Sequence, residues 1–159
     1  MPVIPAFKRL PVVDRTCRLE DLPAQARAYG RDTMTLGWEE RLKIRSFRRS
    51  DAGVELGTSL PRSTVLRDGD CLVVDALRLV IVIVERAEPV FQMTPRDATE
   101  WALFAYHIGN RHLPLMVAAD GLVCPDVPGV ELLLQQYGIA YVRTVRPFTP
   151  AAAPIGHGQ

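Results

Sequence analysis

The first half of the chain alternates short apolar runs with turn residues, which is the pattern of a small β domain. Arg41-Leu42-Lys43-Ile44-Arg45 alternates polar and apolar side chains, so it predicts a strand with one solvated face. Residues 79–84 form a continuous β-branched run and predict a central strand that is buried on both faces. Turn residues separate further apolar runs at 54–56 and 71–74. The region 33–88 therefore predicts a small antiparallel β domain.

The hydrophobic period changes after residue 89. Residues 90–93 predict a strand, and Thr94 and Pro95 then have the residue types of a helix N-cap and first helical position. The pattern predicts a helix from Pro95 to about His107, with Gly109 as its terminator. Apolar residues at helical spacing predict one buried face, which comprises Ala98, Trp101, Ala102, Ala105 and Tyr106. Leu103 and Phe104 are apolar too and would make this face wider.

The rest of the second half predicts two strands, a helix and a last strand. The strands are expected at 115–118 and 121–124, the helix at 127–137 with Asp126 as a cap and Gly138 at its end, and the last strand at 139–145. The order β-α-β-β-α-β is the ferredoxin-like arrangement. We therefore expect an α+β protein with a β domain at 1–88, a ferredoxin-like domain at 89–147, and a short flexible tail at 148–159 that buries little.

Composition and charge exclude several classes of function. The chain has 159 residues, of which 48% are apolar and 23% charged, and its net charge is +1. This balance lacks the basic footprint of a nucleic-acid-binding protein. The longest apolar run, 77–84, is too short to cross a membrane, and the N-terminus lacks the pattern of a secretory signal. We expect a cytoplasmic protein that binds neither nucleic acid nor membrane.

The cysteines fit a reducing compartment. Cys17, Cys71 and Cys124 are odd in number and have no CxxC or zinc-site spacing. We expect them to be small buried residues with reduced thiols. Cys124 ends a predicted strand, so an inert buried thiol is the favoured interpretation there and a metal-binding thiolate is the alternative.

Two of the three histidines lie five residues apart, at His107 and His112. On one helix they would point about 140° apart, so they could not bind one ion from a single helix face. Gly109 and Asn110 are expected to end the helix between them. His107 would then be a helix-terminal or core histidine. His112 would lie in the following loop, as a metal ligand or as a surface residue.

The stretch 106–115, Tyr-His-Ile-Gly-Asn-Arg-His-Leu-Pro-Leu, resembles the signature of the urease accessory protein E family. The Leu-Arg-Asp-Gly-Asp turn at 66–70 with Glu85, and Pro-Phe-Thr-Pro at 147–150, match the same family, and the resemblance covers about residues 33–150. It implies a nickel metallochaperone, not an enzyme. It also implies an N-terminal β domain similar to a chaperone peptide-binding module, followed by a ferredoxin-like metal-binding domain at 89–147.

The resemblance implies that His112 binds Ni(II) at a homodimer interface. A twofold axis would bring a second copy of the same imidazole to the ion. Imidazole also suits Zn(II) and Cu(II), so both metals would compete, and binding should weaken below about pH 6 as imidazole is protonated. Residues 123–128 lack the histidine that many relatives carry, whereas His157 in the tail could reach the ion. His107 and Cys124 are further candidate ligands.

The resemblance also implies protein partners, namely the urease apoprotein complex and the GTPase urease accessory protein. A basic cluster could face an acidic partner, although one solvated sheet face is the simpler interpretation; it comprises Arg41, Lys43, Arg45, Arg48 and Arg49.

Two other functions stay open at this stage. A metal-independent scaffold of the urease assembly complex is one alternative. An enzyme with His107 or His112 as general base is less favoured, because the nearby carboxylates are cap or turn residues; these are Asp97, Glu100 and Asp120.

Overall fold

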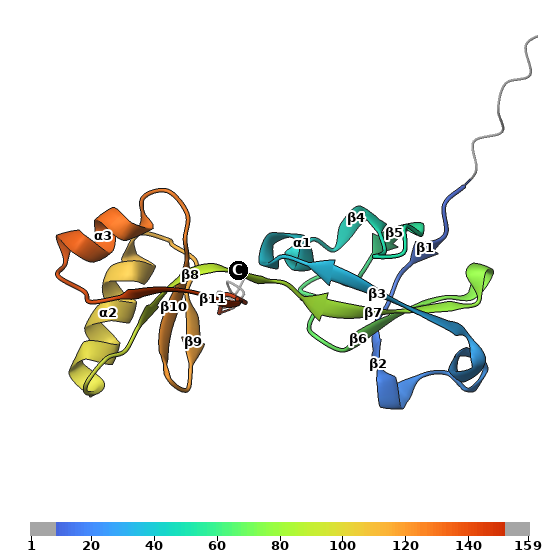
Figure 1. The fold of residues 1–159 in the computed structure, drawn as a ribbon, viewed down its shortest axis with the longest axis horizontal. Helices are drawn as coiled ribbons and strands as arrows, with labels where there is room; N and C mark the ends of the chain where they lie inside the picture. Colours follow the sequence, from blue (N-terminus) through green and yellow to red (C-terminus); the bar gives the residue numbers. More distant parts are fainter. Residues whose placement is uncertain (1–8, 152–159) are drawn as a thin grey trace, which may run out of the picture. The chain divides into compact units, whose positions relative to one another are not determined.

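The structure, a computed structural model, describes residues 9–151 and divides into two compact units, Met1–Glu85 and Arg86–Gln159 (Figure 1). The described residues are α+β, with more strands than helices, as the sequence predicts. Unit 1 contains β1 (Val12–Val13), β2 (Cys17–Arg18), β3 (Gly30–Leu36), α1 (Trp38–Leu42), β4 (Arg45–Arg49), β5 (Glu55–Ser59), β6 (Asp70–Val74) and β7 (Leu79–Glu85), with 3-10 turns at Leu19–Asp21, Ala24–Ala28 and Asp75–Leu77. Unit 2 contains β8 (Ala87–Met93), α2 (Ala98–Asn110), β9 (Met116–Ala118), β10 (Gly121–Pro125), α3 (Val130–Gln136) and β11 (Val142–Pro147).

Unit 1 is built from two small mixed sheets. One has the strand order β1-β5-β4 and the other β2-β6-β7-β3. The prediction that this domain is antiparallel is wrong for two pairs, because β1 runs parallel to β5 and β3 runs parallel to β7. Parallel neighbours need a long crossover. The crossover between β3 and β7 contains α1, β4, β5 and β6. A prediction that pairs each strand with the next strand in the sequence therefore misses this parallel pair.

Strand β7 occupies the centre of its sheet, as its β-branched run predicts. Ile81 and Ile83 belong to one buried cluster, whereas Val80 belongs to a second cluster with Cys71. Successive side chains on a strand point to opposite faces. Both faces of β7 are therefore buried where these residues lie.

The predicted strand at 41–45 is wrong, because α1 occupies its first two residues. The Gly37 N–H donates to Glu40 Oε2 at 2.9 Å, and the Arg41 N–H donates to the Gly37 carbonyl at 3.0 Å. This local cap starts a helical turn at Trp38 and delays the strand until Arg45. Arg41 and Arg48 are buried, so the predicted solvated basic face is also wrong at those two positions.

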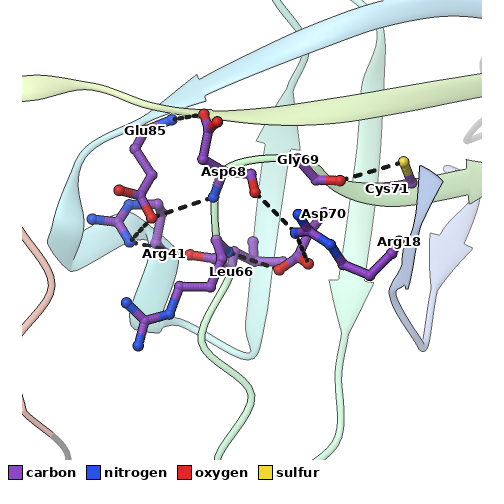
Figure 2. A network of polar contacts seen from close by, with 9 residues as sticks. Arg18, Arg41, Leu66, Asp68, Gly69, Asp70, Cys71 and Glu85 are labelled. Carbon is purple, nitrogen blue, oxygen red and sulfur yellow. Dashed lines mark hydrogen bonds and ion pairs between the residues drawn. The ribbon is translucent and has the colours of Figure 1, made fainter. Parts of the chain in front are cut away.

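The Leu-Arg-Asp-Gly-Asp turn is held by a network of polar contacts (Figure 2). The Arg41 guanidinium donates to the Leu66 carbonyl at 3.1 Å and to Glu85 Oε1 at 3.3 Å. Asp68 and Glu85 each donate a backbone N–H to the other's carboxylate, at 3.3 and 3.2 Å. Because the Arg41 side chain is fully buried, a carboxylate partner is required to offset its desolvation. The motif therefore ties the turn to the last residue of β7.

Unit 2 is a four-stranded sheet with the order β11-β8-β10-β9, and each pair is antiparallel. The element order is β-α-β-β-α-β, as the sequence predicts. One sheet face carries Phe91, Met93, Leu122 and Cys124, which form a buried cluster with residues of α2 and α3. Both helices therefore cover the same face (Figure 1).

Helix α2 begins and ends later than predicted. Its N-cap is Asp97, not Thr94, and the Asp97 carboxylate accepts from the Glu100 N–H at 2.9 Å. Gly109 does not end the helix, which continues to Asn110. Ile108 lies within the helix and is buried in the core, and the buried face differs from the predicted one. The buried or half-buried positions are Trp101, Phe104, Ala105 and Ile108, whereas Ala98, Ala102, Leu103 and Tyr106 are exposed.

Helix α3 is shorter than predicted, and Gly129 rather than Asp126 is its N-cap. Asp126 instead accepts from Arg143 at 3.1 Å. The last strand begins at Val142, three residues later than expected.

The segment that follows β11 is well packed up to the end of the described residues. Phe148 and Thr149 are buried, and the Ala151 N–H donates to the Leu115 carbonyl at 2.7 Å. The expectation that residues from 148 onward bury little is therefore wrong at Phe148 and Thr149.

Candidate metal site

The candidate loop begins where α2 ends in a Schellman motif. The His112 N–H donates to the Gly109 carbonyl at 2.9 Å, and the Leu113 N–H donates to the Ile108 carbonyl at 3.4 Å. These two bonds satisfy carbonyls that a helix C-terminus otherwise leaves without partners. Ile108 and Leu113 belong to the same hydrophobic cluster, which is the apolar contact that accompanies this motif.

His112 occupies the left-handed position of the motif, with φ 54°. Glycine is the usual residue there, because a Cβ atom disfavours positive φ. The His112 side chain is exposed. The backbone therefore adopts a disfavoured conformation at a residue whose side chain contributes no burial. Ser63 and Arg78 share the left-handed backbone, so it marks His112 as a candidate only together with the exposed imidazole and the family signature at 106–115.

His107 lies on the last full turn of α2 and has a different environment. Its ring stacks on the ring of Tyr137, with centroids 3.9 Å apart and an interplanar angle of 17°. The ring of Tyr106 is T-shaped to the imidazole, with centroids 5.4 Å apart. Tyr137 follows the last residue of α3. The half-buried imidazole of His107 therefore joins the C-terminal ends of the two helices. The structure separates the two histidines into a packed one and an exposed one.

Cys124 is fully buried on the helix-covered face of the sheet, opposite Phe91 in the register. Burial raises the pKa of the Cys124 thiol to about 12. The thiol is therefore protonated at neutral pH, whereas a metal ligand must be a thiolate. In this conformation Cys124 has the properties of an inert core residue.

The other predicted ligand, His157, lies outside the described residues. Within residues 9–151 no three side chains of His, Cys, Asp or Glu converge in a way that could hold a metal ion. Among the described residues, His112 therefore has no pair of further His, Cys, Asp or Glu side chains with which it could complete a three-ligand site.

Across residues 9–151, none of the helices is long and apolar enough to cross a membrane.

Apolar side chains lie exposed near His112. A shallow pocket of about 280 Å³ is lined by Arg111 and Leu113, which flank His112, and by Leu132 of α3. Leu132 is 70% exposed, and Tyr106 of α2 is 62% exposed. Sequence reasoning missed both residues as surface groups, because each fits a helical apolar pattern. The buried face of α2 runs through Trp101, Phe104, Ala105 and Ile108, and Tyr106 lies off that face.

The sequence matches two family models along most of its length. Residues 14–85 match the N-terminal domain and residues 88–159 the C-terminal domain of the UreE urease accessory protein. These ranges fall on the two units of the structure.

Curated relatives give the same result. The chain is 40% identical over 127 residues to a urease accessory protein UreE of Paraburkholderia xenovorans. The aligned region covers 80% of this chain and 56% of the relative. The chain is also 40% identical over 127 residues to one of Burkholderia thailandensis, covering 80% of this chain and 59% of the relative. For one of Burkholderia mallei the identity is 38% over 126 residues, covering 79% of this chain and 62% of the relative. The chain thus spans less than two thirds of the length of these relatives. It belongs to the UreE family of urease accessory proteins.

Proposed function

We propose that the chain is a cytoplasmic urease accessory protein, and not an enzyme, that binds Ni(II) as cargo through His112 at a homodimer interface and delivers it to the urease metallocentre. The observation that carries the proposal is the position of His112. An exposed imidazole occupies a backbone position that favours glycine, next to apolar side chains that are exposed in the single chain. We also infer that unit 2 is a ferredoxin-like domain, which its strand order supports.

A homodimer supplies what one chain lacks. One imidazole is a weak ligand, but a twofold axis beside the loop would bring a second His112 to the same ion, because a twofold contact is self-complementary. Leu132 lines the pocket beside Arg111 and Leu113 and is exposed enough to be buried in such a contact. The resulting site would be an open one, with water in the remaining positions, which suits a protein that must release its ion.

The two additional candidates, His107 and Cys124, have other environments in unit 2. His107 is committed to the stack on Tyr137, and the Cys124 thiol is buried and protonated, so we assign ligation to neither. His157 remains a proposed further ligand from the tail. Imidazole ligands also accept Zn(II) and Cu(II), and Cu(II) binds such ligands more tightly than Ni(II), so both metals compete unless geometry and supply exclude them.

The partners of the proposed carrier are the urease apoprotein complex and the GTPase urease accessory protein. This part rests on the family. Of the basic cluster, Lys43 and Arg45 are exposed and could face an acidic partner, whereas Arg49 is exposed but pairs with Glu55 at 2.6 Å.

Calorimetric titration with Ni(II) tests the metal site directly. The informative variant is His112→Gly, because glycine suits the left-handed backbone and keeps the fold. We expect wild type to bind one high-affinity ion per dimer and His112→Gly to bind at least tenfold more weakly. The matched control is His107→Phe, which keeps a ring on Tyr137 and should retain wild-type affinity. Equal affinity in wild type and His112→Gly would contradict the proposal.

A metal-independent scaffold of the urease assembly complex is the second candidate. It is favoured by the lack of three convergent ligands within residues 9–151. The same titration decides between the two, because a scaffold predicts no high-affinity Ni(II) binding by the wild-type chain. A pH series adds a further criterion, since histidine ligation must weaken below about pH 6, where protons compete for imidazole.

A further inference from the structure

Two of the three cysteines lie opposite each other in unit 1. Cys17 of β2 pairs with Cys71 of β6 in an antiparallel register. Cys71 is fully buried in a cluster with Val80, and Cys17 is half-buried and packs against that cluster. Both therefore lie on the same face of the sheet, and both are free thiols.

The spacing of such a pair suits a disulfide bond. Residues directly opposite in an antiparallel pair have Cα atoms about 4.5–5.5 Å apart. Disulfides span about 4.4–6.8 Å between Cα atoms, so the backbone need not move for the two sulfurs to join. Burial raises the pKa of both thiols, so the thiolate that begins the exchange is a minor form at neutral pH and the reaction should be faster at higher pH.

A cleft lies beside one of the two cysteines. It has a volume of about 510 Å³, and Cys17 lines it together with the segment 11–16 and residues 73–76. Cys71 does not line this cleft and has no exposed surface. The two thiols therefore differ in access, with Cys17 as the outer and Cys71 as the inner sulfur.

We propose that Cys17 and Cys71 form a redox-modification site that a small disulfide such as oxidised glutathione converts into a cross-strand disulfide. The Cys17 thiolate attacks one glutathione sulfur, the glutathione disulfide breaks, and one glutathione leaves with a proton. The Cys71 thiolate then attacks the Cys17 sulfur of the mixed disulfide and releases the second glutathione. In total, the two protein thiols lose two electrons and two protons. These electrons and protons pass to the glutathione disulfide, which becomes two molecules of reduced glutathione.

The crosslink would act on the weakest part of its sheet. Strand β2 has two residues and pairs only with β6 in that sheet. A salt bridge from Arg18 to Asp70 at 3.0 Å also holds it, and the Arg18 side chain is 48% exposed. A covalent bond between residues 17 and 71 closes a loop that contains β3, α1, β4 and β5, so it should stabilise unit 1 and fix one wall of the cleft.

The test treats the reduced full chain with excess oxidised glutathione under native conditions and maps the products by mass spectrometry. We expect the loss of two hydrogen atoms, a Cys17–Cys71 crosslinked peptide, and a melting temperature of unit 1 raised by roughly 4 °C or more. Cys71→Ala should stop at a stable glutathione adduct on Cys17. Cys17→Ala should take up no glutathione, and Cys124→Ala should react as wild type does.

Three results would overturn the proposal. The first is that both thiols persist in the folded wild type while an unfolded sample oxidises. The second is a wild type that ends as a stable glutathione adduct on Cys17. The third is a crosslink that contains Cys124. Since the wild-type products alone separate these results, the conclusion stands even where Cys71→Ala folds poorly.

Discussion

The ends of α2 and α3 share one backbone motif but differ in its key residue. In α3 the Gly138 N–H donates to the Gln135 carbonyl at 3.1 Å, and the Ile139 N–H donates to the Leu134 carbonyl at 2.9 Å. The same two bonds end α2, with His112 in the place of Gly138. The φ angles are 64° at Gly138 and 54° at His112. Only the end of α3 has the residue that this backbone prefers, so the backbone geometry does not explain the imidazole at 112.

The two ends are also in physical contact. His107 of α2 stacks on Tyr137, the residue between the end of α3 and Gly138. The C-terminal ends of α2 and α3 are therefore joined by one ring contact. The effects of substitutions at the two ends on the stability of unit 2 can be compared directly. The two tryptophans of the chain lie in different units, Trp38 in unit 1 and Trp101 in unit 2, so their fluorescence can be separated by substitution. In a Trp38→Phe background, fluorescence reports the unfolding of unit 2.

The largest effect is expected from Ile108→Ala, which removes the apolar residue that Leu113 contacts in the motif of α2. Ile108 is fully buried, so the substitution leaves a cavity and should lower the free energy of unfolding of unit 2 by about 2–4 kcal/mol. Urea denaturation followed by Trp101 fluorescence measures it. The equivalent residue in α3 is Leu134, and Leu134→Ala should have a similar cost. A loss below about 1 kcal/mol for Ile108→Ala would mean that the end of α2 does not rest on this contact.

The second prediction places the histidine of one motif into the other. Gly138→His adds a side chain at φ 64°, and no atom lies near its Cβ position, so the cost is conformational alone. We expect a loss of about 1–2 kcal/mol in the free energy of unfolding of unit 2. Thermal or urea unfolding checks it. An unchanged stability would show that the left-handed position is not costly in this protein, and the argument from strain at His112 would fail.

The reverse exchange, His112→Gly, should stabilise unit 2 by about 1 kcal/mol, because glycine removes the Cβ atom from the left-handed position. The same variant is expected to lose Ni(II) binding. A rise in the unfolding midpoint together with a loss of affinity would show that stability is reduced at this residue for the sake of binding. A lower stability of His112→Gly would instead indicate that the imidazole makes a stabilising contact.

The smallest effect is expected at the contact between the two ends. His107→Ala removes the stack on Tyr137 and should cost about 0.5–1.5 kcal/mol, whereas His107→Phe retains an aromatic pair and should cost less. The readout is again the unfolding of unit 2. Loss of Ni(II) affinity in His107→Phe at unchanged stability would be a sign of ligation by His107 and would remove the distinction between the two histidines.

Local patterns in the sequence predicted much of this protein. The apolar run of β7, the β-α-β-β-α-β order of unit 2 and the end of α3 before Gly138 all follow from residue types within a few positions of one another. Errors arose where a neighbouring cap competed. Asp97 with Glu100 forms a better cap than Thr94, and the hydrogen bond of Glu40 with Gly37 replaces a predicted strand by a helical turn.

The sequence alone therefore determined the kinds and order of the elements in unit 2, the central strand of unit 1 and the family, because propensity, capping and motif residues act over short distances along the chain. Tertiary structure decided what depends on distant partners. It buried Arg41 beside Glu85, paired β3 with β7 in parallel, set Cys17 opposite Cys71, and buried Ile108 of α2 in the core. It also left His112 exposed in a left-handed backbone after the helix ends at Asn110, because burial and register depend on which surfaces meet.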